Sequence, residues 1–115
     1  MGYYTAYNLE VYKLENEKLV ILNNQSEIIK KIRGDESENI FYAIDDNGEA
    51  CDEVKWYDHE EDMKIYSKIY PDFIFKLSGI GEENDDIWEK YFYNGKLQIC
   101  PAIIKFDKFD INKLQ

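Results

Sequence analysis

The chain has 115 residues, of which 44% are hydrophobic and 16% aromatic, so it can bury one core and is neither disordered nor two independent domains. It carries 14 Lys and Arg against 24 Asp and Glu, a net charge of −10, which argues against the nucleic-acid backbone or an anionic membrane as its main ligand. It has no apolar run of the ~20 residues that span a membrane and no secretion-signal pattern, so we expect one cytoplasmic domain over residues 1–115.

The first third of the chain predicts a strand, a turn and a short helix. Residues 3–13 alternate along a run rich in β-branched and aromatic side chains, which is typical of a strand. Residues 19–22 form either a short second strand or the lead into a helix. Ser26 is the expected N-cap of a short helix that buries three isoleucines and ends at Gly34.

The middle of the chain predicts a hairpin. Residues 40–44 and 51–57 flank the sequence Asp-Asp-Asn-Gly at 45–48, and an Asn-Gly pair between two apolar runs favours a tight turn. We therefore expect two paired strands, with Val54 and Trp56 pointing inward.

The clearest helix follows this hairpin. Asp58 and Glu61 form a start that resembles a capping box, and Pro71 ends the helix. Its buried face is expected to hold Met63, Tyr66, Ile69 and Tyr70.

The C-terminal part predicts a series of antiparallel strands. Asn94-Gly95 is the strongest turn signal in the chain and predicts a two-residue hairpin. A glycine-rich acidic stretch at 79–86 is expected to be a mobile loop, and residues 102–111 form either a last edge strand or a packed tail. The strands are expected at 73–78, 87–93 and 96–100.

These elements predict an α+β fold. It is a two-layer sandwich in which a mostly antiparallel sheet is covered on one face by two helices, with a ferredoxin-like topology favoured. One core is expected to be shared by Trp56, Met63, Tyr66, Phe73, Phe75, Leu77 and Trp88.

The negative charge is concentrated in residues 35–62, where twelve acids face the single base Lys55, a net charge of −11. Residues 82–86 add a second acidic cluster. Two interpretations stay open: solvated loops that keep a small protein soluble, or a functional surface that binds cations or docks onto a basic groove by imitating nucleic-acid phosphates. For the docking surface we expect the following residues: Asp45, Asp46, Glu49, Asp52, Glu53, Tyr57, Glu60, Glu61, Asp62, Glu82, Glu83, Asp85 and Asp86.

Other site chemistries lack their sequence patterns. His59 is the only histidine and is expected on the surface of the first helical turn, without a catalytic partner. Cys51 and Cys100 form no CxxC motif and are expected to be buried free thiols. The turn at 45–49 resembles part of a calcium loop but lacks the EF-hand spacing. We therefore predict no metal, no cofactor and no catalytic residue.

Residues 54–96 also suggest a family. They combine V-K-W-Y, a capped helix, Y-P-D-F-I-F-K-L, a Gly-Glu-Glu turn, D-I-W-E-K-Y-F and a closing N-G-K. This pattern resembles the YubB-like ferredoxin-like domains and related small proteins of phages, plasmids and integrative elements. The resemblance implies an accessory protein of a mobile element and brings no catalytic residues.

Taken together, the sequence favours an interaction protein over an enzyme. Our leading hypothesis is a small acidic protein of a phage or mobile element that inhibits a bacterial defence nuclease, of the anti-CRISPR or anti-restriction type. Its partner would be a nucleic-acid-processing enzyme with a basic groove in the bacterial cytoplasm. The chain itself would contact no nucleic acid or membrane and would be a monomer or a small homo-oligomer. The alternatives are an accessory protein-binding or structural domain without inhibitory role, and a small metal-dependent hydrolase.

Overall fold

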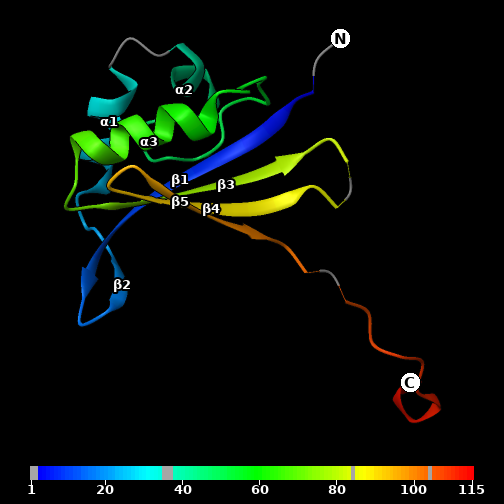
Figure 1. The fold of residues 1–115 in the computed structure, drawn as a ribbon. Helices are drawn as coiled ribbons and strands as arrows, with labels where there is room; N and C mark the ends of the chain where they lie inside the picture. The colour runs from blue at the N-terminus through cyan, green and yellow to red at the C-terminus, as the bar shows by residue number, and fades with distance from the viewer. Residues whose placement is uncertain (1–2, 35–37, 84, 104) are drawn as a thin grey trace.

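The computed structural model describes residues 3–34, 38–83, 85–103 and 105–115. In this part of the chain, five strands form one antiparallel sheet in the order β2-β1-β3-β4-β5 (Figure 1). The strands are β1 (Thr5–Glu15), β2 (Lys18–Ile21), β3 (Ile74–Gly81), β4 (Ile87–Tyr93) and β5 (Lys96–Pro101). Three α-helices lie between β2 and β3 in the sequence: α1 (Gln25–Arg33), α2 (Glu38–Ala43) and α3 (His59–Ile69).

The sheet has one buried face and one open face, as alternating strands require. In β1 the side chains of Tyr7, Leu9 and Val11 are buried beneath the helices. The register pairs Leu9 with Leu77 and Val11 with Phe75, so β1 and β3 supply the centre of the same layer. Helices α1 and α2 contact β1, whereas α3 contacts β3, β4 and β5.

The predicted α+β two-layer sandwich is confirmed. The ferredoxin-like description applies to its architecture, an antiparallel sheet with helices packed against it. In this chain the helices follow one another in a single connection between the β1–β2 hairpin and the β3–β4–β5 meander. The described residues contain three helices, one more than predicted.

The additional helix, α2, replaces the first strand of the predicted hairpin. Ile40, Ala43 and Ile44 are spaced three and four residues apart and are all buried, whereas Phe41 and Tyr42 between them are exposed. This spacing matches a helix period, whereas the strand prediction depended on the Asn-Gly turn that follows the apolar run.

The second strand of the predicted hairpin is also absent from the described residues. Residues 44–54 are extended only at two isolated bridges in the described chain: Ile44 with Ala50 inside the segment, and Val54 with Thr5 of β1. Hydrogen bonds from Leu9 N–H to Gly48 O and from Ala50 N–H to Asn8 Oδ1 also join this segment to β1. The predicted turn between the strands does form, because Gly48 N–H donates to Asp45 O over 3.0 Å and Gly48 has a φ of +82°. Two constraints require glycine at position 48. Its positive φ disfavours other residues, and a side chain there would collide with the backbone of Leu9.

Both predicted helix caps differ from expectation. Ser26 lies inside α1, and Asn24 occupies the N-cap position. Asp58 is the N-cap of α3 as predicted, but its side chain makes no capping hydrogen bond. The predicted end of α1 at Gly34 is confirmed.

The predicted core is largely confirmed. Of its seven members, Phe73 and Trp88 are partly buried against the core and the other five are buried within it. Ile69 was expected on the buried face of α3 but is exposed, and Ser67 is buried there instead. The Ser67 hydroxyl accepts a hydrogen bond from Gly95 N–H over 2.8 Å, which joins α3 to the β4–β5 turn.

The strand predicted at 73–78 runs from Ile74 to Gly81, so it includes part of the stretch predicted as a loop. Both two-residue hairpin turns use residues with positive φ, Asn16 and Glu17 in one and Asn94 and Gly95 in the other. The Asn94-Gly95 turn was predicted, and its geometry matches the twist of the strands it joins.

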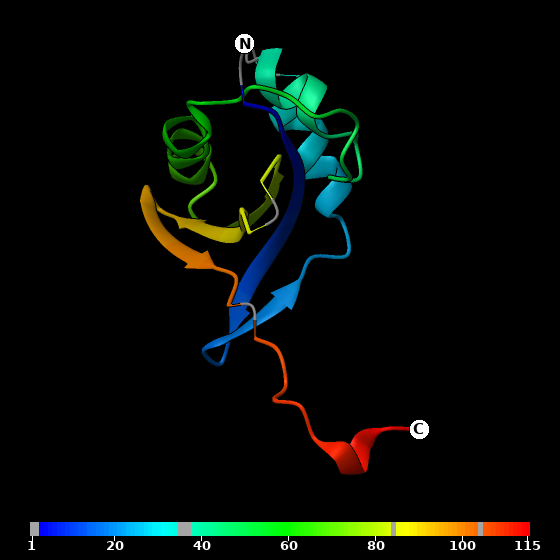
Figure 2. The same cartoon turned by 90° about the vertical axis from the view of Figure 1, so that its right-hand side faces the viewer.

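After Pro101 the chain leaves the sheet and extends away from it (Figure 2). The prediction of a last strand or a packed tail is wrong for the described residues of this segment, which contain only the 3₁₀ turn η1 (Ile111–Lys113) and are exposed. Proline has no N–H to donate to a further strand, which explains why the ladder stops there. Across the described chain, no helix has both the length and the apolarity needed to cross a membrane.

Phe75 is fully buried on the central strand β3, so Phe75→Ala is expected to lower the free energy of unfolding by about 3–5 kcal/mol. Denaturant titration measures this loss. Ile80→Ala changes an exposed position on the same strand and should cost less than about 1 kcal/mol. Equal losses in the two variants would contradict the assignment of faces.

Candidate functional site

Tyr3 joins two acidic segments that are far apart in the sequence. Its backbone N–H donates to the Tyr57 hydroxyl over 2.9 Å, and its own hydroxyl donates to Asp86 Oδ2 over 2.6 Å. The Glu83 N–H in turn donates to the Tyr3 hydroxyl over 3.1 Å. The hydrogen bond to Asp86 raises the pKa of Tyr3, because the proton is shared with a carboxylate.

Tyr4 strengthens the same junction. Its N–H donates to Glu82 Oε1 over 3.0 Å, and the Lys55 amine lies 5.0 Å from the centre of its ring. The bridge between Thr5 and Val54 fixes the next residues of both segments. We use the name acidic end for the surface formed around Tyr3 and Tyr4 by Glu53, Tyr57, Glu82, Glu83, Asp85 and Asp86.

The first turn of α3 lies beside the acidic end. The Trp56 indole donates from Nε1 to Asp62 Oδ2 over 2.7 Å, and the His59 ring is stacked on Trp88 with 5.1 Å between ring centres. Because Trp88 follows Asp86 by two residues, this stack places the start of the helix next to the acidic turn. Glu60, Glu61 and Asp62 therefore adjoin the acidic end, as the docking hypothesis requires.

The turn at 45–49 is not part of this surface. It contacts β1 at Leu9, whose N–H donates to Gly48 O over 2.8 Å, four residues from the bridge at Thr5. Four residues of strand correspond to ~13 Å. Asp46 forms an ion pair with Arg33, and Asp45 Oδ1 accepts the N–H groups of Asn47 and Glu49 over 2.8 and 3.0 Å.

The predicted docking residues thus divide into two groups. One group is committed to contacts within the fold: Asp45, Asp46, Glu60, Asp62, Glu82 and Asp86. The other group is exposed, although Glu61 lies 3.9 Å from the Lys64 amine: Glu49, Asp52, Glu53, Glu61, Glu83 and Asp85. Asp35 and Glu36, which belong to the acidic segment of the sequence, lie outside the described residues. Only the exposed acids can offer their full charge to a partner.

Two aromatic rings accompany these charges. Tyr57 is 65% exposed and Tyr4 is 41% exposed, so both present a face to solvent although their backbone or hydroxyl groups are hydrogen-bonded. Tyrosines held rigidly on a polar surface are frequent anchors of protein interfaces. The acidic end therefore combines charge with preformed apolar contact area.

A second cluster, beneath the acidic end, was not anticipated. Lys90 is only 8% exposed, and its amine lies 2.7 Å from His59 Nε2, 2.8 Å from Glu60 Oε2 and 4.1 Å from the centre of the Trp88 ring. His59 Nδ1 lies 2.8 Å from the Trp56 carbonyl oxygen. These distances define one proton arrangement: Nδ1–H donates to the carbonyl, and Nε2 accepts from the Lys90 ammonium.

The cluster favours a neutral imidazole. Burial lowers the pKa of His59 below its ordinary value, and the nearby Lys90 charge acts in the same direction. The hydrogen bond from Lys90 lowers the pKa of Glu60. His59, expected on the helix surface, therefore points inward and takes part in holding the start of α3 on β4. The sequence signal for this inward position was Lys90, which alternates with Trp88 and Phe92 and therefore lies on the same, core-facing side of β4.

Within the described residues, no group of three or more His, Cys, Asp or Glu side chains is placed to hold a metal ion. Cys51 and Cys100 are free thiols, but the prediction that they are buried is wrong. Cys51 lies in the irregular segment between the two isolated bridges and is exposed. Cys100 lies opposite Glu89 in the register of β5 with β4 and is partly exposed.

Comparison of the chain with protein-family models, curated proteins and solved structures found no match.

Because the neutral form of His59 is favoured in the fold, stability is expected to fall as the pH drops below about 6.5, where the unfolded chain binds the additional proton. The imidazole faces Lys90, Glu60, Asp62 and the Tyr7 ring. The lowered pKa of Glu60 acts only below its ordinary value of 4.5, so the two effects separate.

The measurement is the thermal midpoint of the wild type and His59→Asn across this pH range, with an NMR titration of the single imidazole. The variant should lose the dependence above about pH 5 because an amide does not titrate. The same slope in both proteins would show that His59 is not the responsible group.

We also expect the thermal midpoint to be unchanged by a chelator or a reductant, since the described residues contain no cluster of metal-ligating side chains and both cysteines are free thiols. A structural metal or disulfide contributes several kcal/mol, so its loss would lower the midpoint by many degrees. Thermal unfolding with and without each reagent measures this, and a large fall with either would contradict the expectation.

Proposed function

We propose that this protein is an interaction module that docks its acidic end onto a basic groove of a protein partner. The observation that carries this proposal is the junction at Tyr3, which fixes the turn at 82–86 against Tyr57. Fixed charges lose little conformational freedom on binding. They also attract and orient a basic partner before contact.

The arrangement of the acids supports docking over solubility alone. Solubility requires only dispersed charge, whereas here Glu83 and Asp85 are exposed while Tyr3 and Tyr4 hold their turn in place. Like charges held close together destabilise a fold. A role in binding would explain why this chain nevertheless holds them together by hydrogen bonds. Tyr57 and Tyr4 would supply the apolar contact that charge alone does not.

A groove that binds nucleic acid is the most suitable partner, because its Lys and Arg side chains are spaced to neutralise phosphates. In its specific form, we propose that the protein inhibits a bacterial defence nuclease, of the anti-CRISPR or anti-restriction type, by occupying this groove. The resemblance to YubB-like proteins of phages and plasmids supports this setting.

The first test is charge reversal at the acidic end. Glu83→Lys with Asp85→Lys should weaken capture of the partner from a bacterial lysate by about tenfold or more and should lower the salt concentration needed for elution. Mass spectrometry identifies the captured protein. DNA binding and cleavage by that enzyme, measured with each variant added, report inhibition directly.

The matched control is Glu15→Lys with Glu17→Lys, which makes the same change of charge at the β1–β2 turn, at the far end of β1. It should keep wild-type capture. Equal losses of capture in the two variants would show that binding depends on the net charge of the protein and not on the acidic end. Capture of a partner without any effect on its activity would favour the accessory-domain alternative.

A further inference from the structure

The C-terminal segment exposes an unusual amount of apolar side chain. Residues 105–114, which we name the arm, include four large apolar side chains that are 65–91% exposed. These are Phe106, Phe109, Ile111 and Leu114. Isolated apolar side chains are common on protein surfaces, but four within ten residues form a concentrated apolar segment of the kind that marks interaction sites.

The arm also extends away from the body of the protein (Figure 2). The radius of gyration is 16.5 Å, whereas a compact chain of this length has ~13 Å. The only side-chain hydrogen bonds of its described residues join arm residues to one another: Asp110 accepts from Asn112 N–H over 3.0 Å, and Lys113 pairs with Asp107 at 3.4 Å. The four apolar side chains of the arm therefore face solvent and are not packed against the sheet or the helices.

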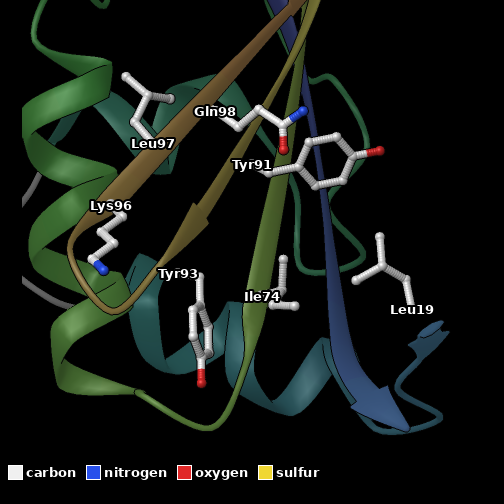
Figure 3. Close-up of a pocket in the computed structure, with 7 residues that line it drawn as sticks. All are labelled: Leu19, Ile74, Tyr91, Tyr93, Lys96, Leu97 and Gln98. Carbon is white, nitrogen blue, oxygen red and sulfur yellow. The ribbon is translucent and has the colours of Figure 1, made fainter. Parts of the chain in front are cut away.

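The open face of the sheet carries a complementary apolar hollow (Figure 3). Its volume is about 360 Å³, and four strands line it: Leu19 of β2, Ile74 of β3, Tyr91 and Tyr93 of β4, and Lys96, Leu97 and Gln98 of β5. Figure 3 shows these side chains around the hollow, and the helices pack on the opposite face of the sheet, which holds Phe75 and Phe92. The hollow is wide enough for an aromatic side chain.

Charge favours the same pairing. The last fourteen residues, 102–115, contain three lysines and two aspartates, whereas the rest of the chain has a net charge of −11. On the open face, Lys76 is held between Glu10 at 3.4 Å and Glu89 at 2.9 Å, a group with a net charge of −1, whereas Lys96 adds a positive charge at the hollow itself. The arm lysines complement the group of Glu10, Lys76 and Glu89.

We propose that the arm of one copy of this chain docks on the open face of a second copy, with an aromatic ring in the hollow, and that the exchange is reciprocal. The direction of the chain argues for a second copy over the same copy. The hollow lies at the start of β5, whereas the chain leaves the sheet at the end of β5, after Ala102 N–H donates to Ile87 O over 2.9 Å, and continues away from the body (Figure 2). To reach the hollow of its own copy, the chain would have to reverse its direction directly after β5.

The test is sedimentation velocity of the full chain over a wide range of concentration. The wild type should form a dimer. The arm variant, Phe106→Asp with Phe109→Asp, should weaken dimerisation by about tenfold or more, and so should the face variants Leu19→Asp and Tyr93→Asp, tested separately. Ile65→Asp, which changes an exposed apolar residue of α3 in the other layer, should leave the dimer unchanged.

Mixing distinguishes exchange between copies from other modes. The arm variant retains its face and the Leu19→Asp variant retains its arm, so an equimolar mixture keeps one arm–face contact per pair and should dimerise more strongly than either variant alone. A monomeric wild type would overturn the proposal, and so would a dimer that survives the arm and face variants. Glu83→Lys with Asp85→Lys should leave dimerisation intact, which keeps this test separate from partner binding.

Discussion

The burial of Trp56 is the constraint on which the acidic half of the molecule depends. Its ring is packed 5.3 Å from the centre of the Tyr7 ring, and its carbonyl accepts the Tyr7 hydroxyl over 3.2 Å. Its indole N–H binds Asp62, so a single residue connects β1 and α3. Burying a large aromatic side chain stabilises a fold by several kcal/mol only when its polar atom also finds a partner. Tyr57 is the next residue, so the position of the acidic end follows from this anchor.

The fold separates its acids by role, and this separation accounts for how a chain with a net charge of −10 remains folded. Acids that face the structure are neutralised locally, as Glu60 is by Lys90 and Asp46 is by Arg33. Other acids, such as Glu83 and Asp85, lie on an exposed turn, where water screens their repulsion. The cost of self-repulsion is thereby confined to the surface, where it can be relieved by a basic partner.

The sequence predicts most of the sheet, because alternation and the Asn94-Gly95 turn are local signals. It fails at residues 40–44, where a six-residue helix and a strand give similar apolar runs and only tertiary packing decides between them. It also fails for His59: its neighbours in the sequence are charged, which indicated an exposed position, whereas its neighbours in space are Trp88 and Lys90. The junction at Tyr3 joins residues more than fifty positions apart, and no local pattern could reveal it.

Gly79 lies directly beneath the Trp88 indole, and any side chain there would occupy the volume of that ring. The two residues are register partners on neighbouring strands, so neither can move away without breaking the ladder. The space above position 79 is therefore filled by the side chain of Trp88, so the sizes of these two residues are coupled. A larger residue at 79 is compatible with this fold only if position 88 loses its bicyclic ring, so in any lineage that preserves the fold these two codons are expected to change together or not at all.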